Sequence, residues 1–144
     1  MMLIACKSSS SRDEVSIIKA LGEVDTIVDI AAVTEDNDPN GRLNKVGGYS
    51  AQIYFSSNLV DQESVSGTTV IEKGTDCGGS IEVYKTKKEA RERNEELASY
   101  DGSVLASGSH VVDGTCVIRI SNELTASQQE ELEANIIVVL KDHK

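Results

Sequence analysis

The stretch VLASGSHVVDGTCVIRI, residues 104–120, decides the fold. Asp113 and Gly114 stand between two runs that we predict to be strands, 104–112 and 116–120. An Asp-Gly pair between such runs is a strong signal for a tight β-hairpin, because both central residues of that turn need a left-handed backbone. We therefore predict two neighbouring antiparallel strands over residues 104–112 and 116–120.

Three further segments are predicted strands. Residues 26–33 are rich in β-branched side chains, and residues 81–84 form a short strand. Residues 49–55 alternate, which predicts one buried face and one wetter face. The two sets are Tyr49, Ala51, Ile53 and Phe55 against Ser50, Gln52 and Tyr54.

Three helices are predicted from capping boxes, in which a Ser or Thr is followed three residues later by Glu or Gln. The boxes begin at Ser11, Thr86 and Thr125. Gly22 and Gly102 are placed to end the first two helices as left-handed caps. Apolar residues follow each box at helical spacing: Val15, Ile18 and Leu21; Ala90 and Leu97; and Leu132, Ile136, Val139 and Leu140.

The order of these elements is α-β-β-β-α-β-β-α, which predicts an α+β fold. We expect a two-layer sandwich, in which three helices pack on one face of a largely antiparallel sheet of about five strands. Residues 80–140 have the β-α-β-β-α order of a ferredoxin-like half. A chain of 144 residues is long enough for one ordinary core, so residues 11–144 are expected to form a single domain.

The composition excludes nucleic acid as a partner. The chain has 14 Lys and Arg against 24 Asp and Glu, a formal net charge of −10. No basic stripe exists to displace counterions from phosphates. Aromatic residues are scarce, with four Tyr, one Phe and no Trp, which disfavours stacking platforms for bases or sugars.

No pattern in the sequence predicts an enzyme. Ser109 and His110 are neighbours, and neighbouring residues of a strand point to opposite faces, so they cannot form a nucleophile–base pair. A partly exposed strand histidine is the simpler interpretation. The run 85–96 alternates in charge and predicts a solvated helix face with pairs such as Glu89–Arg93. We therefore expect a protein without catalytic residues and without an organic cofactor.

The N-terminus resembles the end of a bacterial lipoprotein signal peptide. Leu3-Ile4-Ala5-Cys6 matches the lipobox, although the basic region and the longer apolar run of a full signal are missing. The interpretation makes residues 1–10 a signal remnant and Ser-rich tether, with Cys6 as the lipidated residue. It predicts an extracytoplasmic protein anchored to the membrane by lipid. The alternative is an ordinary N-terminus with an accidental cysteine.

One loop matches part of a calcium-binding motif. Asp36, Asp38 and Asn40 alternate before Gly41, as in the first half of an EF-hand loop. The twelfth position is Gly47, so the bidentate glutamate is missing. The sequence therefore predicts either a weak calcium site, with a dissociation constant of about 0.1–1 mM, or a plain turn built on Asp-Pro-Asn-Gly.

Cys77 and Cys116 could form a disulfide in an exported protein. The predicted arrangement argues against it, because antiparallel strands place the two cysteines at opposite ends of the sheet. A long loop before residue 81 could still bring them together, so both states stay open.

The chain as a whole resembles a family of small secreted or lipid-anchored proteins of Gram-positive bacteria. The resemblance implies an extracytoplasmic protein and implies no activity. Three blocks carry it: residues 32–41 (AVTEDNDPNG) with 43–45 and 47–49; residues 79–84 (GSIEVY) with Ala90 and Arg93; and residues 107–110 (SGSH) with 114–119 and 124–125.

These observations together predict a non-enzymatic binding or envelope accessory module. Its partner would be a protein or the cell wall, besides the membrane that holds the lipid on Cys6. Two alternatives remain, a peptidoglycan-binding module and an inhibitor or accessory protein of an extracellular enzyme. The scarcity of aromatic residues counts against the first, and an acidic surface that meets a basic partner would suit the second.

Overall fold

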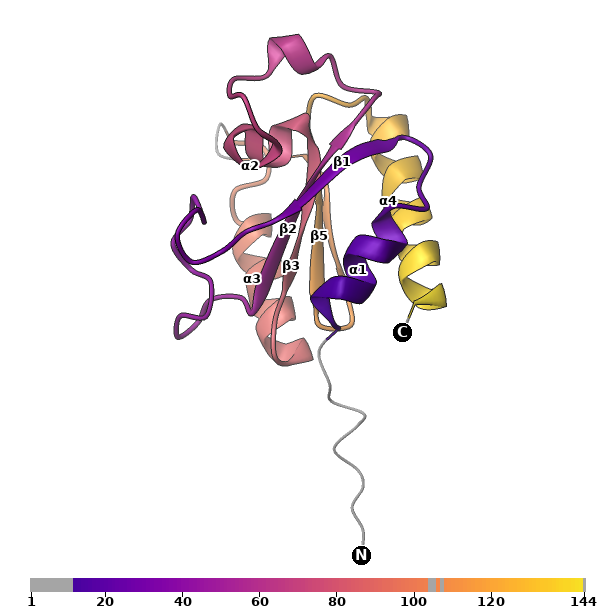
Figure 1. Ribbon diagram of the computed structural model, residues 1–144. Helices are drawn as coiled ribbons and strands as arrows, with labels where there is room; N and C mark the ends of the chain where they lie inside the picture. The colour runs from indigo at the N-terminus through magenta and orange to yellow at the C-terminus, as the bar shows by residue number, and fades with distance from the viewer. Residues whose placement is uncertain (1–11, 104–105, 107, 144) are drawn as a thin grey trace, which may run out of the picture.

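The computed structural model describes residues 12–103, 106 and 108–143 (Figure 1). The predicted tether and Cys6 lie outside these residues. In chain order the elements are α1 (Glu14–Leu21), β1 (Ile27–Ala32), β2 (Ala51–Ser57), η2 (Gln62–Ser64), α2 (Val70–Lys73), η3 (Gly74–Cys77), β3 (Gly78–Val83), α3 (Lys87–Ala98), β4 (His110–Asp113), β5 (Cys116–Ile120) and α4 (Ala126–Asp142).

The five strands form one sheet in the order β1-β2-β3-β5-β4, and every neighbouring pair is antiparallel. This confirms the predicted α+β class with a five-stranded antiparallel sheet. From β3 the chain passes through α3 to β4 and returns in β5 between the two. This is the split β-α-β arrangement of a ferredoxin-like half.

The predicted hairpin is present. Asp113 pairs with Cys116, and Gly114 takes a left-handed backbone with φ of 64° in the turn between them. β5 has the predicted bounds, whereas β4 begins only at His110. Residues 106, 108 and 109 of the predicted strand belong to no strand, and residues 104, 105 and 107 are outside the described part.

One face of the sheet is apolar at its centre. Ile53, Ile81 and Ile118 stand opposite one another across the three central strands and are fully buried. Helices α1 and α4 cover this face side by side (Figure 1). The side chains that they bury against it include Ile17, Leu21, Leu132, Ile136 and Leu140.

The other face of the sheet is polar and yet buried. Gln52, Glu82 and Val117 stand opposite one another, and each is fully buried. Helix α3 covers this face by burying Ala90 and Leu97, so the sheet carries helices on both faces and not on one (Figure 1). The prediction of a wetter face for the second strand is also wrong, because all seven residues of β2 are buried.

Capping explains where the helices begin. Thr86 and Thr125 are the N-caps of α3 and α4, as predicted, whereas Asp13 and not Ser11 caps α1. A further capping box, Thr69 with Glu72, starts α2, a fourth helix that we did not predict. Neither glycine is a left-handed cap at a helix end. Gly22 caps α1 with a right-handed backbone, and α3 ends at Ala98, before Gly102.

No helix in the described part of the chain combines the length and the apolar character needed to cross a membrane.

Candidate functional site

A carboxylate is buried in the polar face of the sheet. Glu82 is the second-last residue of β3, and its side chain is 0% exposed. An isolated buried charge is very costly, so such a group needs partners that carry the opposite charge or donate hydrogen bonds. Arg119 of β5 donates to its Oε2 at 3.2 Å, and the Tyr84 hydroxyl donates to its Oε1 at 2.7 Å.

Helix α3 supplies the strongest partner of this carboxylate. Arg93 Nε lies 2.9 Å from Glu82 Oε1, and Arg93 Nη2 lies 3.3 Å from Glu82 Oε2. A two-point contact of this kind fixes direction as well as distance. Arg93 stands three residues after Ala90 and four before Leu97, so the helix face that packs on the sheet also directs this guanidinium at Glu82.

This placement corrects the prediction for the run 85–96. We expected Arg93 on a solvated face and paired with Glu89, but its side chain is only 14% exposed and pairs with Glu82 and Glu96. The sequence did contain one signal for the buried position of Arg93, because Arg93 stands at helical spacing between Ala90 and Leu97. Nothing in the local sequence indicated a buried carboxylate opposite it.

Glu82 and its partners Tyr84, Arg93 and Arg119 form an ion cluster, and its titratable groups Glu82, Tyr84 and Arg93 are held in their ordinary charge states. Burial alone would raise the pKa of Glu82, but Arg93, Tyr84 and Arg119 outweigh it and hold that pKa below its usual value. Burial and the adjacent Glu82 charge raise the pKa of the Tyr84 hydroxyl. Burial would lower the pKa of Arg93, but the carboxylates of Glu82 and Glu96 raise it. Near neutral pH the cluster is therefore carboxylate, phenol and guanidinium.

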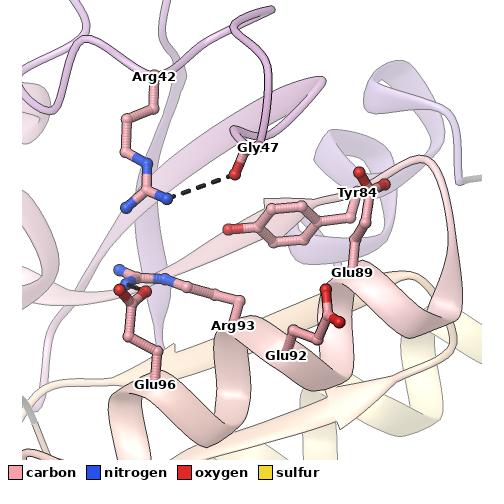
Figure 2. Close-up of a pocket in the computed structure, with 7 residues that line it drawn as sticks. All are labelled: Arg42, Gly47, Tyr84, Glu89, Glu92, Arg93 and Glu96. Atoms are coloured by element: carbon pink, nitrogen blue, oxygen red, sulfur yellow. Dashed lines mark hydrogen bonds and ion pairs between the residues drawn. The ribbon is translucent and has the colours of Figure 1, made fainter.

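A pocket of about 280 Å³ lies beside this cluster, and we call it the charged pocket (Figure 2). The guanidinium groups of Arg42 and Arg93 face one another near the hydroxyl end of the Tyr84 ring, while Glu89 and Glu92 lie toward the other end of that ring (Figure 2). Its lining residues are Arg42, Gly47, Tyr84, Glu89, Glu92, Arg93 and Glu96.

The three glutamates of the lining follow from the spacing of α3. Positions 89, 92 and 96 are separated by three and four residues, so they form one strip along the helix next to Arg93. Glu89 Oε1 accepts from the Thr86 hydroxyl at 3.4 Å, and Glu92 lies 3.9 Å from Lys88 with both side chains well exposed. Such exposed contacts neutralise little charge.

The predicted calcium loop positions Arg42. Asp38 Oδ2 accepts from the backbone N–H groups of Arg42 at 2.8 Å and Leu43 at 2.9 Å. Its Oδ1 accepts from the Tyr49 hydroxyl at 2.7 Å and from the Asn40 N–H at 3.0 Å. Partial burial would raise the pKa of Asp38, but these four hydrogen bonds lower it below its usual value.

A further side-chain hydrogen bond, apolar packing and a close backbone approach hold the rest of the loop. Asn40 Nδ2 donates to the Tyr49 hydroxyl at 3.1 Å, and Leu43 and Tyr49 are buried against Tyr84. A Cβ built on Gly48 would lie 2.0 Å from the Arg42 carbonyl oxygen, so only glycine fits there. The loop is thus held rigidly over the end of α3.

The three predicted calcium ligands, Asp36, Asp38 and Asn40, lie in different environments. Both oxygens of Asp38 accept hydrogen bonds from the protein, Asn40 offers its amide N–H to tyrosine, and Asp36 is exposed. The geometry of Asp38 and Asn40 is that of the turn interpretation. In the described part of the chain no three His, Cys, Asp or Glu side chains are arranged to hold a metal ion.

Cys77 and Cys116 are both buried free thiols. Cys77 directly precedes β3, and Cys116 pairs with Val83 at the other end of that strand. Six strand residues span about 17 Å, well beyond the Cα separation of about 7 Å that a disulfide tolerates. The disulfide is therefore not formed in this structure. Burial raises the pKa of Cys77 to about 11 and that of Cys116 to about 12.

His110 is held by groups other than those of the pocket. Its Nδ1 lies 2.7 Å from Asn94 Oδ1, and its Nε2 lies 3.1 Å from the carboxylate of Asp101. These partners come from α3 and the segment after it, not from the loop that contains Asp36 and Asp38. The structure therefore does not bring His110 together with the predicted loop residues.

Comparison of the chain with protein-family models, with curated proteins and with solved structures found no match.

Proposed function

We propose that this protein is a non-enzymatic binding module that holds a small charged ligand in the charged pocket. The observation that carries the proposal is Arg42. Its guanidinium lines the pocket opposite Arg93, and within the described part of the chain no carboxylate forms an ion pair with it (Figure 2). A cation that is fixed in a pocket and not neutralised by the protein is suited to bind an anionic group.

The site is rigid, which favours binding. Asp38 holds the backbone of Arg42, and Glu82 holds the side chain of Arg93. Groups that are already fixed lose little conformational freedom when a ligand arrives, so more of the contact energy contributes to affinity.

The charge states of the site support a binding role over a catalytic one. A general acid or base works best with a pKa near the working pH. The pKa of Glu82 is lowered, and those of Tyr84 and Arg93 are raised, so all three move away from neutrality. Such groups hold charge in place and are poorly suited to exchange protons with a substrate.

We also propose that a lipid on Cys6 holds the domain at the extracytoplasmic face of the membrane. The lipobox-like Leu3-Ile4-Ala5-Cys6 supports this proposal. The test is detergent phase partitioning of the protein expressed from its native gene in its own host. The wild type is expected in the detergent phase and the Cys6→Ser variant in the aqueous phase. Equal partitioning of the two would refute the anchor.

The binding proposal is tested by two-dimensional ¹H–¹⁵N NMR with acetate, methylguanidinium and glycine as probes. We expect at least acetate or glycine to shift the backbone amides of residues 42–48 and 84–96. Arg42→Gln should abolish these shifts, because the probe carboxylate loses its free cation.

Arg91→Gln is the matched control, since Arg91 is exposed on the same helix and does not line the pocket. It should keep the shifts of the wild type. Shifts that survive Arg42→Gln, or no shifts with any of these probes or with a free dipeptide, would overturn the charged pocket as a binding site.

A further inference from the structure

We infer that the ligand of the charged pocket is a zwitterion of dipeptide size, with its carboxylate between Arg42 and Arg93 and its ammonium group at Glu89 and Glu92. This inference rests on the proposed function, and it adds the chemical class and the direction of the ligand. It is carried by Arg42 at one end of the pocket, which pairs with no carboxylate in the described part of the chain, and by Glu89 and Glu92 at the other end, whereas the charge of Arg93 is already balanced by Glu82 and Glu96.

The end of the pocket at Arg42 fits an anionic group. Arg93 has five N–H groups, of which three donate to Glu82 and Glu96. Figure 2 shows the guanidinium of Arg42 facing that of Arg93, with the Glu96 carboxylate beside Arg93. A carboxylate placed there would accept from both guanidinium groups, in the planar geometry that arginine prefers.

The other end fits a cationic group. Glu89 and Glu92 line the pocket from successive turns of α3, and only Lys88 forms an ion pair with either of them in the described part of the chain, at 3.9 Å. An ammonium group placed between the two carboxylates would donate to both, since it carries three N–H donors. Methylene or methyl groups between the two ends would lie along the Tyr84 ring.

The length of the pocket sets the size of the ligand. Glu89 and Arg93 are four residues apart on α3, which is about 6 Å along the helix axis. An extended dipeptide spans about 7 Å, so its two termini reach both ends at once, whereas the charges of a single α-amino acid are too close together. The volume of about 280 Å³ lies at the lower limit of ordinary ligand pockets, which excludes long chains lying wholly inside.

The test uses four probes built on one dipeptide: L-alanyl-L-alanine with free termini, the same dipeptide with its amine acetylated, with its carboxylate amidated, and with both ends blocked. Affinities are measured by NMR titration of the residue 84–96 amides. We expect the free dipeptide to bind most tightly, each single block to weaken binding about tenfold, and the doubly blocked form not to bind.

Two variants assign the ends. Arg42→Gln should bind the free and the amidated dipeptide with equal affinity, because the carboxylate of the dipeptide no longer contributes. The double variant Glu89→Gln, Glu92→Gln should bind the free and the acetylated dipeptide with equal affinity, because the ammonium group no longer contributes. Thermal melts of both proteins show that they are folded, and Arg91→Gln serves again as the control.

The possible failures are distinguishable. If acetate or glycine shifts the pocket but a blocked dipeptide binds as well as the free one, the zwitterion is wrong and the binding module stands. The zwitterion is equally wrong, and the binding module still stands, if acetate or glycine binds but none of the four dipeptides does. If no probe of either experiment shifts the pocket, both the inference and the proposed function fall.

Discussion

Arg93 of α3 contacts both carboxylate oxygens of Glu82 on β3, through Nε at 2.9 Å and Nη2 at 3.3 Å. This contact ties the helix to the sheet, since α3 otherwise buries only Ala90 and Leu97 among its own residues. It also places one wall of the charged pocket at a fixed distance from the end of β3, which Tyr84 directly follows.

Glu82→Gln should destabilise the protein by about 3 kcal/mol, because it leaves buried guanidinium groups without their carboxylate. The measurement is urea unfolding followed by circular dichroism. Lys88→Gln is the control, since it removes an exposed pair and should change stability by less than about 0.5 kcal/mol. A loss below about 1 kcal/mol for Glu82→Gln would show that the cluster is not a major stabilising contact.

Stability should fall as the pH drops below about 4.3, the ordinary pKa of glutamate. The folded state lowers the pKa of Glu82, so it binds fewer protons there than the unfolded chain does, and stability rises with pH. The contribution is complete above the unfolded pKa and is lost as the pH falls through the folded one. In urea titrations from pH 6 to 3, Glu82→Gln should show a shallower pH dependence than the wild type, and parallel curves would contradict this assignment.

Asp38→Ala should destabilise the protein more than Tyr49→Phe. Tyr49→Phe removes two hydrogen bonds, the one that the hydroxyl donates to Asp38 and the one that it accepts from Asn40, at a cost of about 1–2 kcal/mol. Asp38→Ala removes the acceptor of four donors and should cost about 2–3 kcal/mol, since several of those donors are partly buried. It should also weaken dipeptide binding by releasing Arg42, whereas Tyr49→Phe should change binding little. Equal effects of the two variants on binding would remove Asp38 as the positioning residue.

Calcium should leave the melting temperature unchanged. Both oxygens of Asp38 already accept hydrogen bonds from the protein, so a metal ion would have to displace them. Differential scanning fluorimetry with calcium several-fold above about 1 mM, the weak limit for extracellular sites, is compared with the same concentration of magnesium. A rise seen with calcium alone and abolished by Asp36→Asn would instead support the predicted weak calcium site.

The thiols of Cys77 and Cys116 should be unreactive in the folded protein at pH 8. Both side chains are buried, and their pKa values are raised to about 11 and about 12, so the reactive thiolate is rare. In a Cys6→Ser background, a chromogenic disulfide reagent should detect no thiol until urea unfolds the chain and then two thiols. No thiol in urea without reductant would demonstrate a disulfide.

The sequence predicted the fold well where local signals were strong. The Asp113-Gly114 turn placed the hairpin, and the boxes at Thr86 and Thr125 placed the starts of α3 and α4. The box at Thr69 obeys the same rule, but α2 has only four residues, too few to show an apolar period. The alternation in β2 led to a wrong prediction of exposure, because a strand covered on both faces can still carry polar residues.

The site was much less predictable than the fold. Arg42, Glu82 and Arg93 come from a loop, a strand and a helix, and no motif in the sequence links the three. Their contact depends on the register of β3 and on the packing angle of α3, which no short motif encodes. The loop around Asp38 was identified as special for its oxygen-rich spacing, but its role depends on the backbone that those oxygens bind.

The two unlike faces of the sheet have a consequence for the fidelity of folding. A slip of β3 by one residue would turn Glu82 into the hydrocarbon layer and Ile81 toward the arginines. The slipped pairing would be unstable for two reasons, because Glu82 would be buried without its cationic partners and Ile81 would lose its apolar contacts. The ion cluster therefore rejects misregistered pairings during assembly, in addition to any ligand that it helps to bind.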